Sequence, residues 1–423
     1  MEYRRRIVDD ELDDLLTELP AMALQGPRGI GKTATAERRA RTAWYLDDPA
    51  QRAIAEADPF HLLDGEAPIL IDEWQRVPAV WDAVRRAVDR GSEPGRFLLT
   101  GSSSPSAAPS HSGAGRIVTL RMRPMTLAER GIGEPTVSLS RLLRGDHPQI
   151  AGSTGVTLAD YVHEIVASGF PAIRQLSDRA LRRQLDGYLS RIIDTDFEDQ
   201  GHAVRRPETL ERWMAAYAAA TATTASFETI RDAATGGQGD KPAKTATVPY
   251  REVLERLWIL DPVLPWLPSR NWLHRLSQAP KHHLADPGLA TRMLGLATGA
   301  LLGGQETSVA VPRDGTLLGH LFESLVTLCV RVQAQPAEAR VRHLRLHGAR
   351  REVDLIVERA DQRIVALEVK LSGVVEDADV RNLIWLRDQL GEDLLDAAVI
   401  NTGPRAFRRA DGVAVIPLAL LGA

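Results

Sequence analysis

The chain has 423 residues, of which 44% are hydrophobic and 26% are charged, as is ordinary for soluble globular proteins. At roughly 150 residues per domain, this length predicts two or three domains, each large enough to bury its own core. The 52 Lys and Arg residues against 56 Asp and Glu residues give a net charge of −4, which excludes a chain-wide basic surface for nucleic acid and leaves only local patches.

The cysteine content and the hydropathy of the sequence predict the cellular compartment of the protein. The single cysteine, Cys329, excludes an intramolecular disulfide and a Cys-rich zinc site, and it fits a reducing environment. Charges occupy the first residues, MEYRRRIVDDELDD, where a signal peptide needs an apolar core. Apolar runs stay short of the roughly 20 residues that a membrane helix requires. We therefore expect a cytoplasmic protein without a membrane partner.

The first 130 or so residues alternate short apolar runs with amphipathic stretches. Apolar runs at Ala21–Leu24, Ile69–Ile71 and Phe97–Leu99 are each followed by polar turn residues. Helical patterns over Thr33–Trp44 and Ala79–Val88 lie between them. This alternation predicts a parallel sheet with crossover helices.

The rest of the chain changes character twice. Residues 158–229 have helical periodicity, and a helix, a loop, a helix and a short apolar hairpin favour a winged-helix module near 230–275. From residue 280 onward, a helix at Leu317–Val332 precedes three strands, a further helix and a strand at Ala397–Asn401. The C-terminal order is therefore αβββαβ.

The segment GPRGIGKT, from Gly26 to Thr33, matches the pattern G-x-x-x-x-G-K-[ST] in full, between an apolar strand and a helix. Glycines let backbone N–H groups curl around phosphates, and the helix N-terminus adds positive potential. Lys32 would reach the β- and γ-phosphates, and the Thr33 hydroxyl would ligate Mg²⁺. A glycine-rich turn without a ligand is the alternative, and the complete motif favours ATP and Mg²⁺. The residues expected around the nucleotide are Gly26, Pro27, Arg28, Gly29, Ile30, Gly31, Lys32, Thr33 and Asp72.

Further candidates for hydrolysis follow the next strands. Asp72 and Glu73 end a buried strand, where Asp72 would hold Mg²⁺ through water and Glu73 would act as general base. Thr100, at the tip of the third strand, would orient the attacking water, with a purely structural threonine as the alternative. Arg116 would neutralise transition-state charge, in cis or across a subunit boundary.

A second constellation of charged residues lies near the C-terminus. Thirteen residues separate Asp354 from Glu368-Val369-Lys370, and Glu323 lies upstream on a helix. Neighbouring strands would bring Asp354 and Glu368 together, with Lys370 on the same face. Carboxylates so placed can hold Mg²⁺ against a phosphodiester, and the lysine can position water. The alternative is a set of solvated charges on exposed strands.

With these motifs in this order, the chain resembles the bacterial and archaeal AAA-type ATPases that carry a C-terminal DUF4143 domain. The segments that carry the resemblance are GPRGIGKT, PILIDEWQRVPAVWDAVRRAVD, FLLTGSSS, GRIVTLRMRPMTLAE, SGFPAIR, YLSRIIDTDFED and ADPGLATRMLG. The resemblance makes Lys32 the Walker A lysine and Asp72-Glu73 the Walker B pair. Arg116 matches the arginine of the family's S-L-x-G-R segment, although the four residues before it read Ser-Gly-Ala-Gly here.

The same resemblance assigns the C-terminal part to a PD-(D/E)xK nuclease-like, restriction-endonuclease-like fold. It implies metal ligation by Glu323, Asp354 and Glu368, with Lys370 as the catalytic lysine. AAA-type ATPases often complete their site with a neighbour's arginine, so a homo-oligomer is expected.

We therefore predict an α/β chain in four parts: a P-loop AAA-type ATPase domain with a parallel sheet (residues 1–135), a helical region (136–229), a possible winged-helix module (230–275) and a DUF4143, nuclease-like α/β domain (280–423). The favoured function is Mg-dependent ATP hydrolysis coupled to a nucleic-acid-directed, nucleolytic C-terminal domain acting on DNA or RNA. The alternative is a nucleotide-switched DNA-binding regulator, or a scaffold or sensor, whose nuclease-like domain is inactive.

Overall fold

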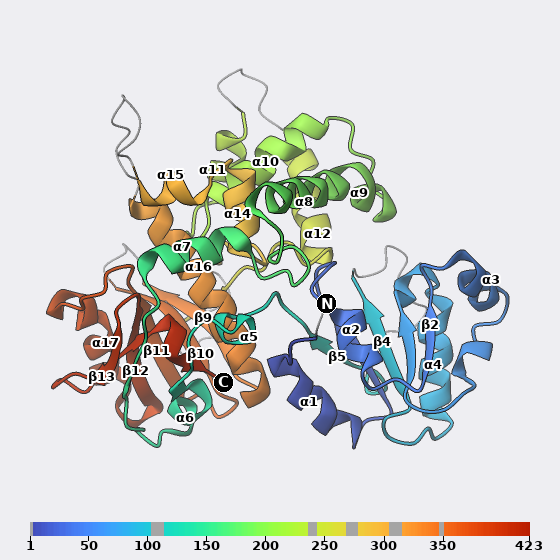
Figure 1. The fold of residues 1–423 in the computed structure, drawn as a ribbon, viewed down its shortest axis with the longest axis horizontal. Helices are drawn as coiled ribbons and strands as arrows, with labels where there is room; N and C mark the ends of the chain where they lie inside the picture. The colour runs from blue at the N-terminus through green and yellow to red at the C-terminus, as the bar shows by residue number, and fades with distance from the viewer. Residues whose placement is uncertain (1–2, 103–113, 236–242, 268–277, 304–314, 347–350) are drawn as a thin grey trace.

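The computed structural model describes residues 3–102, 114–235, 243–267, 278–303, 315–346 and 351–423 (Figure 1). Two α/β regions lie side by side, and a helical region lies across them. The N-terminal region is blue, the helical region green to yellow and the C-terminal region orange to red in Figure 1.

The N-terminal region is built on a five-stranded, wholly parallel sheet with the order β2-β3-β4-β1-β5. β1, β3 and β4 are apolar and almost fully buried because helices cover both faces of the sheet. Their carboxyl ends share one edge, which brings the residues after each strand together. The strands are β1 (Ala21–Gln25), β2 (Thr42–Tyr45), β3 (Ile69–Asp72), β4 (Phe97–Gly101) and β5 (Val118–Arg121), and the helices are α1 (Ile7–Leu16), α2 (Lys32–Glu37), α3 (Pro49–Ala57), α4 (Ala79–Asp89) and α5 (Leu127–Arg130).

One element differs from the expectation. The helix predicted over Thr33–Trp44 ends at Glu37, and Thr42–Tyr45 form β2. β-branched and aromatic residues fit a pleated strand, and pairing of Thr42 with Ile69 and of Trp44 with Ile71 adds backbone hydrogen bonds that a longer helix would forgo. The helical periodicity of this short segment was therefore overridden by a tertiary contact.

The helical region contains a π-helical turn at Ile192–Asp196, directly after α8. In the described part of the chain, its helices are α7 (Leu158–Ala167), α8 (Asp178–Arg191), α9 (Phe197–Asp199), α10 (Pro207–Ala219), α11 (Phe227–Ala233), α12 (Lys244–Arg256), α14 (Pro287–Met293) and α15 (Thr298–Leu302). π-Helical turns interrupt the regular ladder and often occur at functional sites.

The winged-helix module expected at residues 230–275 stays a prediction, but the structure continues its elements beyond both of its predicted bounds. α10 packs against α11, so the boundary placed between residues 229 and 230 separates elements that lie together. Leu260 and Val263 form antiparallel bridges with Leu284 and Lys281, which lie beyond the predicted end of the module at residue 275. The strand β8 (Leu264–Trp266) then joins the C-terminal sheet beside β9. The predicted module thus shares its strand with the next region.

The C-terminal region is a mixed eight-stranded sheet with the order β7-β13-β14-β12-β11-β10-β9-β8. Its expected order of helix, three strands, helix and strand is present. The bounds are α6 (Leu139–Arg144), α16 (Gly315–Ala334), α17 (Asp377–Leu390), β6 (Val137–Ser138), β7 (Gly152–Ser153), β9 (Arg340–Arg345), β10 (Glu352–Glu358), β11 (Ile364–Val369), β12 (Leu394–Asn401), β13 (Arg405–Arg408), β14 (Ala414–Pro417) and β15 (Leu421–Gly422). An α/β architecture therefore describes both regions.

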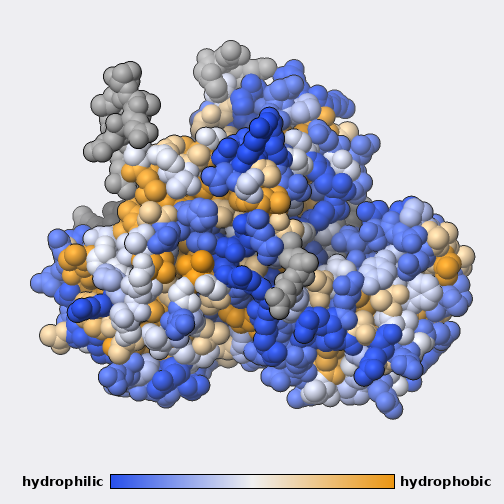
Figure 2. Space-filling model, viewed as in Figure 1, coloured by the Kyte–Doolittle hydropathy of each residue, from blue (hydrophilic) through white to orange (hydrophobic). Residues whose placement is uncertain are grey.

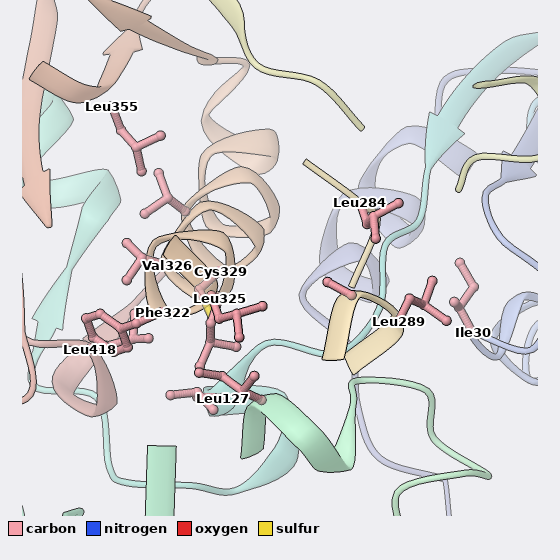
Figure 3. Packing of buried hydrophobic residues seen from close by; sticks show 14 of the residues in the cluster. Ile30, Leu127, Leu284, Leu289, Phe322, Leu325, Val326, Cys329, Leu355 and Leu418 are labelled. Atoms are coloured by element: carbon pink, nitrogen blue, oxygen red, sulfur yellow. The ribbon is translucent and has the colours of Figure 1, made fainter. Parts of the chain in front are cut away.

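The helix α16 is the central core element. Figure 3 shows its side chains Phe322, Leu325, Val326 and Cys329 among buried apolar residues, with Leu418 nearby. By length and composition, Thr316–Ala337 is the one helix among the described residues that could cross a membrane, yet 78% of its apolar window is buried inside the fold. Its hydrophobicity is accounted for by packing.

The surface in the view of Figure 2 is mostly hydrophilic over the N-terminal and helical regions. An apolar area lies over α15 and the adjoining part of the C-terminal region.

Candidate functional site

The loop between β1 and α2 has a backbone that requires glycine. Gly26 adopts a φ of +156°, and a Cβ there would lie 2.1 Å from the carbonyl oxygen of Met122. Gly29 and Gly31 have φ values of +81° and +96°, in the left-handed region that disfavours side chains. The glycines of the motif are therefore explained by the shape of a loop that presents N–H groups at a helix N-terminus.

Lys32 begins α2 and is buried, with 5% of its surface exposed. Its Nζ donates to the carbonyl oxygens of Gly26 at 2.9 Å and Pro27 at 2.8 Å. Burial lowers the pKa of Lys32 to about 8, and the nearby Glu73 and Asp72 carboxylates only partly offset this effect. The ammonium is therefore held in the loop by neutral partners and would gain from an anionic ligand.

Asp72, at the end of β3, contacts the first turn of α2 and the neighbouring strand β4. Its Oδ1 accepts a hydrogen bond from Thr33 Oγ1 at 2.8 Å and another from the Thr100 hydroxyl. Burial raises the pKa of Asp72, and the two hydroxyl donors counteract this shift. Thr33 and Asp72 offer the oxygen ligands that Mg²⁺ prefers, so these residues fit that ion. Thr100 is fully buried and holds Asp72, which is the structural alternative considered for it.

Glu73 follows with a left-handed backbone, at a φ of 54°. Its Oε2 accepts from Gln75 Nε2 at 2.6 Å and from Ser102 Oγ at 3.0 Å. Both donors orient the carboxylate that was predicted to act as general base. Neither was identified from the sequence, because a Gln and a Ser in polar turns carry no distinguishing pattern.

Two arginines connect the loop with the rest of the chain. Arg28, one of the residues expected around the nucleotide, forms an ion pair with Asp196 of the π-helical turn at 2.9 Å. Arg6, which precedes α1, donates to the Ile30 carbonyl at 2.9 Å and pairs with Glu129 at 3.0 Å while only 4% exposed. The loop is thus held from both the N-terminal helix and the helical region.

Arg116 does not lie at this site. It precedes β5, and its Nε is 2.7 Å from Asp89 Oδ1 at the end of α4. Because the sheet is parallel, the start of β5 and the end of α4 belong to the edge opposite the Gly26–Thr33 loop. This placement corrects the expectation that Arg116 acts in cis; action on a neighbouring subunit stays a prediction.

The C-terminal carboxylates gather around a lysine that sequence reasoning did not identify. Lys281 Nζ lies 2.8 Å from Glu323 Oε1 and 3.1 Å from Asp354 Oδ1. Glu352 Oε1 is 3.4 Å away, and the second oxygen of Asp354 accepts from the Val369 N–H at 2.9 Å. Burial alone would lower the pKa of Lys281, but Asp354, Glu323 and Glu352 outweigh it and raise the pKa. Lys281 is therefore a buried, charged centre of the cluster.

The other half of this group is formed by Glu368, on β11 beside β10, and by Lys370, directly after β11. Lys370 Nζ is 3.0 Å from Glu368 Oε1 and 3.8 Å from Asp379. Burial and the neighbouring Asp354 raise the pKa of Glu368. Burial also raises the pKa of Glu323 to about 8, an effect that Asp354 reinforces.

These residues do not fit the divalent ion expected at Glu323, Asp354 and Glu368. Among the described residues, no group of three or more His, Cys, Asp or Glu side chains has an arrangement that could hold a metal ion. Oxygens of Glu323 and Asp354 instead contact the ammonium of Lys281. The fold does bring the expected carboxylates together, but the ammonium of Lys281 lies between Glu323 and Asp354.

Three family models match successive parts of the chain. Residues 18–130 match the family described as AAA domain, residues 158–299 a domain of unknown function, DUF8612, and residues 318–421 another, DUF4143. Uncharacterized proteins of Mycobacterium bovis and Mycobacterium tuberculosis are each 26% identical over 305 residues, which cover 70% of this chain and 61% of theirs. The chain thus matches about 61% of the length of these relatives.

Two solved structures share a weaker likeness. A Walker-type ATPase of Pyrococcus abyssi has 15% identity over 67% of this chain and 94% of its own, with a TM-score of 0.38. The ORC2 protein of Aeropyrum pernix, in ADPNP–ADP complexes, has 14% identity over 69% and 93%, with a TM-score of 0.29.

The domain match and the assembled loop define an AAA-type P-loop NTPase region with the features of an ATP-hydrolysing enzyme, followed by a DUF4143 region. The complete loop motif and its partners at the strand ends support nucleotide binding.

Proposed function

We propose that this chain hydrolyses Mg-ATP and that its nucleotide state controls the binding of DNA or RNA by the helical and C-terminal regions. The observation that carries the proposal is the ion pair between Arg28, inside the P-loop, and Asp196, in the π-helical turn. A change at the phosphates would alter this contact directly, because the loop that holds them also holds the helical region.

The chemistry follows from the residues at the strand ends. Phosphates would replace the Gly26 and Pro27 carbonyls as partners of Lys32, so its ammonium would exchange neutral acceptors for charged ones. Bound Mg²⁺ would supply charge neutralisation beside Thr33 and Asp72. Glu73, oriented by Gln75 and Ser102, would accept a proton from the attacking water.

Apolar contacts support the transmission of this change. Figure 3 shows Ile30 of the P-loop beside Leu289 and Leu284, which belong to the helical region. A Cβ added at Gly29 would lie 3.7 Å from Phe170, another residue of that region. A shift of the loop by a fraction of an ångström would therefore disturb close-packed side chains rather than solvent.

A groove between the three regions supports nucleic-acid binding. Its volume is about 620 Å³, and its arginines are Arg121, Arg123, Arg331, Arg340 and Arg342. Asp261 pairs with Arg121 at 3.0 Å, with Arg123 at 2.8 Å and also with Arg331. Three guanidinium groups on one carboxylate leave an excess of positive charge, which suits a phosphate backbone.

The proposed role is binding without cleavage. The surroundings of Glu323, Asp354 and Glu368 do not fit the metal that the predicted nuclease would need. This favours the regulator or sensor alternative over the nucleolytic one. A homo-oligomer remains part of the proposal, because Arg116 is half-exposed on the edge away from its own P-loop and could reach only a neighbour's site.

The test combines hydrolysis with binding. Lys32→Ala should abolish ATP hydrolysis, because it removes the only side-chain ammonium proposed to contact the phosphates. The affinity for labelled duplex DNA and single-stranded RNA, measured by fluorescence anisotropy, should differ several-fold between a non-hydrolysable ATP analogue and ADP. Arg28→Ala should bind nucleotide but lose that difference, whereas Arg183→Ala, an exposed arginine on the same helical region, should keep it.

Three results would contradict the proposal. They are hydrolysis by Lys32→Ala at the wild-type rate, affinity for nucleic acid that is equal in both nucleotide states, and an Arg28→Ala protein that switches like the wild type. Binding should also weaken steeply with salt, since phosphate contacts dominate it.

A further inference from the structure

Lys281 lies where the carboxylates of the C-terminal region converge. Its ammonium is 2.8 Å from Glu323 on α16 and 3.1 Å from Asp354 on β10, and 1% of its side chain is exposed. Glu352, also on β10, is 3.4 Å away at the more open side. An ammonium at these distances neutralises the carboxylates by charge-assisted hydrogen bonds.

The position of Lys281 is set by its backbone. Its N–H donates to the Val263 carbonyl and its carbonyl accepts from the Val263 N–H, both at 2.9 Å. The next residue, His282, donates to the Thr223 carbonyl at 2.8 Å. These bonds fix the backbone of Lys281 in a bridged segment of the helical region, from which its side chain reaches the carboxylates.

The arrangement differs from a divalent-cation site in its oxygens. Mg²⁺ takes oxygen ligands at about 2.0–2.1 Å in a near-octahedral arrangement. Here the two oxygens of Asp354 accept from Lys281 and from the Val369 N–H, and Oε1 of Glu368 contacts Lys370. The buried Oε2 of Glu368 accepts no hydrogen bond from the described residues, and a single such oxygen does not make a divalent site.

Electrostatic repulsion also disfavours a divalent cation at this cluster. A divalent ion placed between Glu323 and Asp354 would share their oxygens with a fixed positive charge, and the repulsion would act in a poorly screened interior. Expelling the ammonium instead would leave a buried cation without its partners.

We infer that Lys281 stands in the place of the divalent cation, so that the C-terminal carboxylate cluster of this chain is a metal-independent structural centre rather than a nuclease centre. The inference concerns the C-terminal cluster alone and does not require the P-loop to bind or hydrolyse ATP. It assigns to Lys281 the role of a built-in counter-ion that joins the helical region to α16 and β10.

The test counts Mn²⁺ ions bound to the full chain by electron paramagnetic resonance, without nucleotide. All proteins carry Asp72→Asn, which removes the carboxylate proposed to hold Mg²⁺ at the P-loop site. The parent protein should bind no Mn²⁺ that depends on Asp354. Lys281→Met, which keeps the aliphatic length and removes the charge, should gain one Mn²⁺ per chain, and adding Asp354→Asn should abolish that gain. Lys281→Arg, which keeps the charge, should gain none.

Two outcomes would overturn the inference. One is a parent protein that binds a Mn²⁺ ion lost on Asp354→Asn, and the other is a folded Lys281→Met protein that gains no Mn²⁺. Circular dichroism establishes folding first. If Lys281→Met does not fold, Lys281→Gln takes its place in the second outcome. The first outcome is measured on the parent protein and needs neither variant. Because ATP hydrolysis is not read in this assay, its failure and that of the ATPase proposal are distinguishable.

Discussion

The buried Lys32 ammonium predicts that the affinity for ATP falls as the pH rises through about 8. Burial lowers the pKa of Lys32 to about 8 in the free protein, against an ordinary value of 10.5. Phosphates beside the ammonium would raise this pKa in the complex, because an adjacent negative charge favours the protonated form. Above pH 8 the free protein must therefore take up a proton when ATP binds, and that uptake weakens binding.

The magnitude follows from the same pKa. An ammonium with a pKa of about 8 is about nine-tenths protonated at pH 7 and about one-tenth protonated at pH 9. The apparent ATP affinity should therefore fall about tenfold across this interval, equivalent to ~1.4 kcal/mol. The fold itself responds with the opposite sign: because the unfolded lysine has the higher pKa, the stability of the free protein gains from this group as the pH rises from 8 to 10.5.

Isothermal titration calorimetry at pH 7, 8 and 9 with saturating Mg²⁺ measures this effect. Buffers of different ionisation enthalpy count the protons taken up. Lys32→Ala should bind ATP weakly and with little pH dependence over this range. A wild-type affinity that stays constant from pH 7 to 9 without proton uptake, while Lys32→Ala still binds weakly, would refute the reasoning.

Two further predictions concern the effect of Ser102 on ATP hydrolysis and the effect of Asp261 on the stability of the fold. Ser102→Ala removes a hydroxyl that donates to Glu73 at 3.0 Å; a hydrogen bond to a charged group contributes about 1.5–3 kcal/mol, so kcat for ATP should fall at least about tenfold while KM changes little. Steady-state kinetics measures both constants, and an unchanged kcat would show that Ser102 does not position the base. Asp261→Asn leaves three clustered arginines without their shared carboxylate, and the free energy of unfolding should fall by about 3–5 kcal/mol. Urea denaturation followed by tryptophan fluorescence gives this difference, and a loss below about 1 kcal/mol would contradict a stabilising role for the cluster.

Local patterns succeeded where the chemistry is contiguous in the chain. The Gly26–Thr33 loop lies within eight residues, and its glycines, lysine and threonine each have a position that the loop geometry explains. The apolar run Ile69–Ile71 likewise predicted a strand that ends at Asp72, and β3 is buried over its whole length. In contrast, the helix expected through Trp44 was wrong, since β2 obtains its partner from β3, which follows later in the chain.

No local sequence pattern predicted the contacts between residues that lie far apart in the chain. Arg6 reaches the P-loop carbonyl of Ile30 across 24 positions, and nothing in its charged neighbourhood distinguishes it from a surface arginine. Arg116 lies near the predicted strand ends in sequence, but the direction of β5 places it at the opposite edge of the sheet.

Composition alone determined the net charge of −4. The order of motifs along the chain predicted the P-loop, the Asp72-Glu73 pair that follows it and the grouping of the C-terminal carboxylates. Only the tertiary structure decided what neutralises those carboxylates. Lys281 lies 42 positions from Glu323 and 73 from Asp354, and its backbone bridge to Val263 aims the ammonium between them. A charged group acts at a few ångströms, and which cation arrives at that distance is determined by the packing of distant segments rather than by the motif itself.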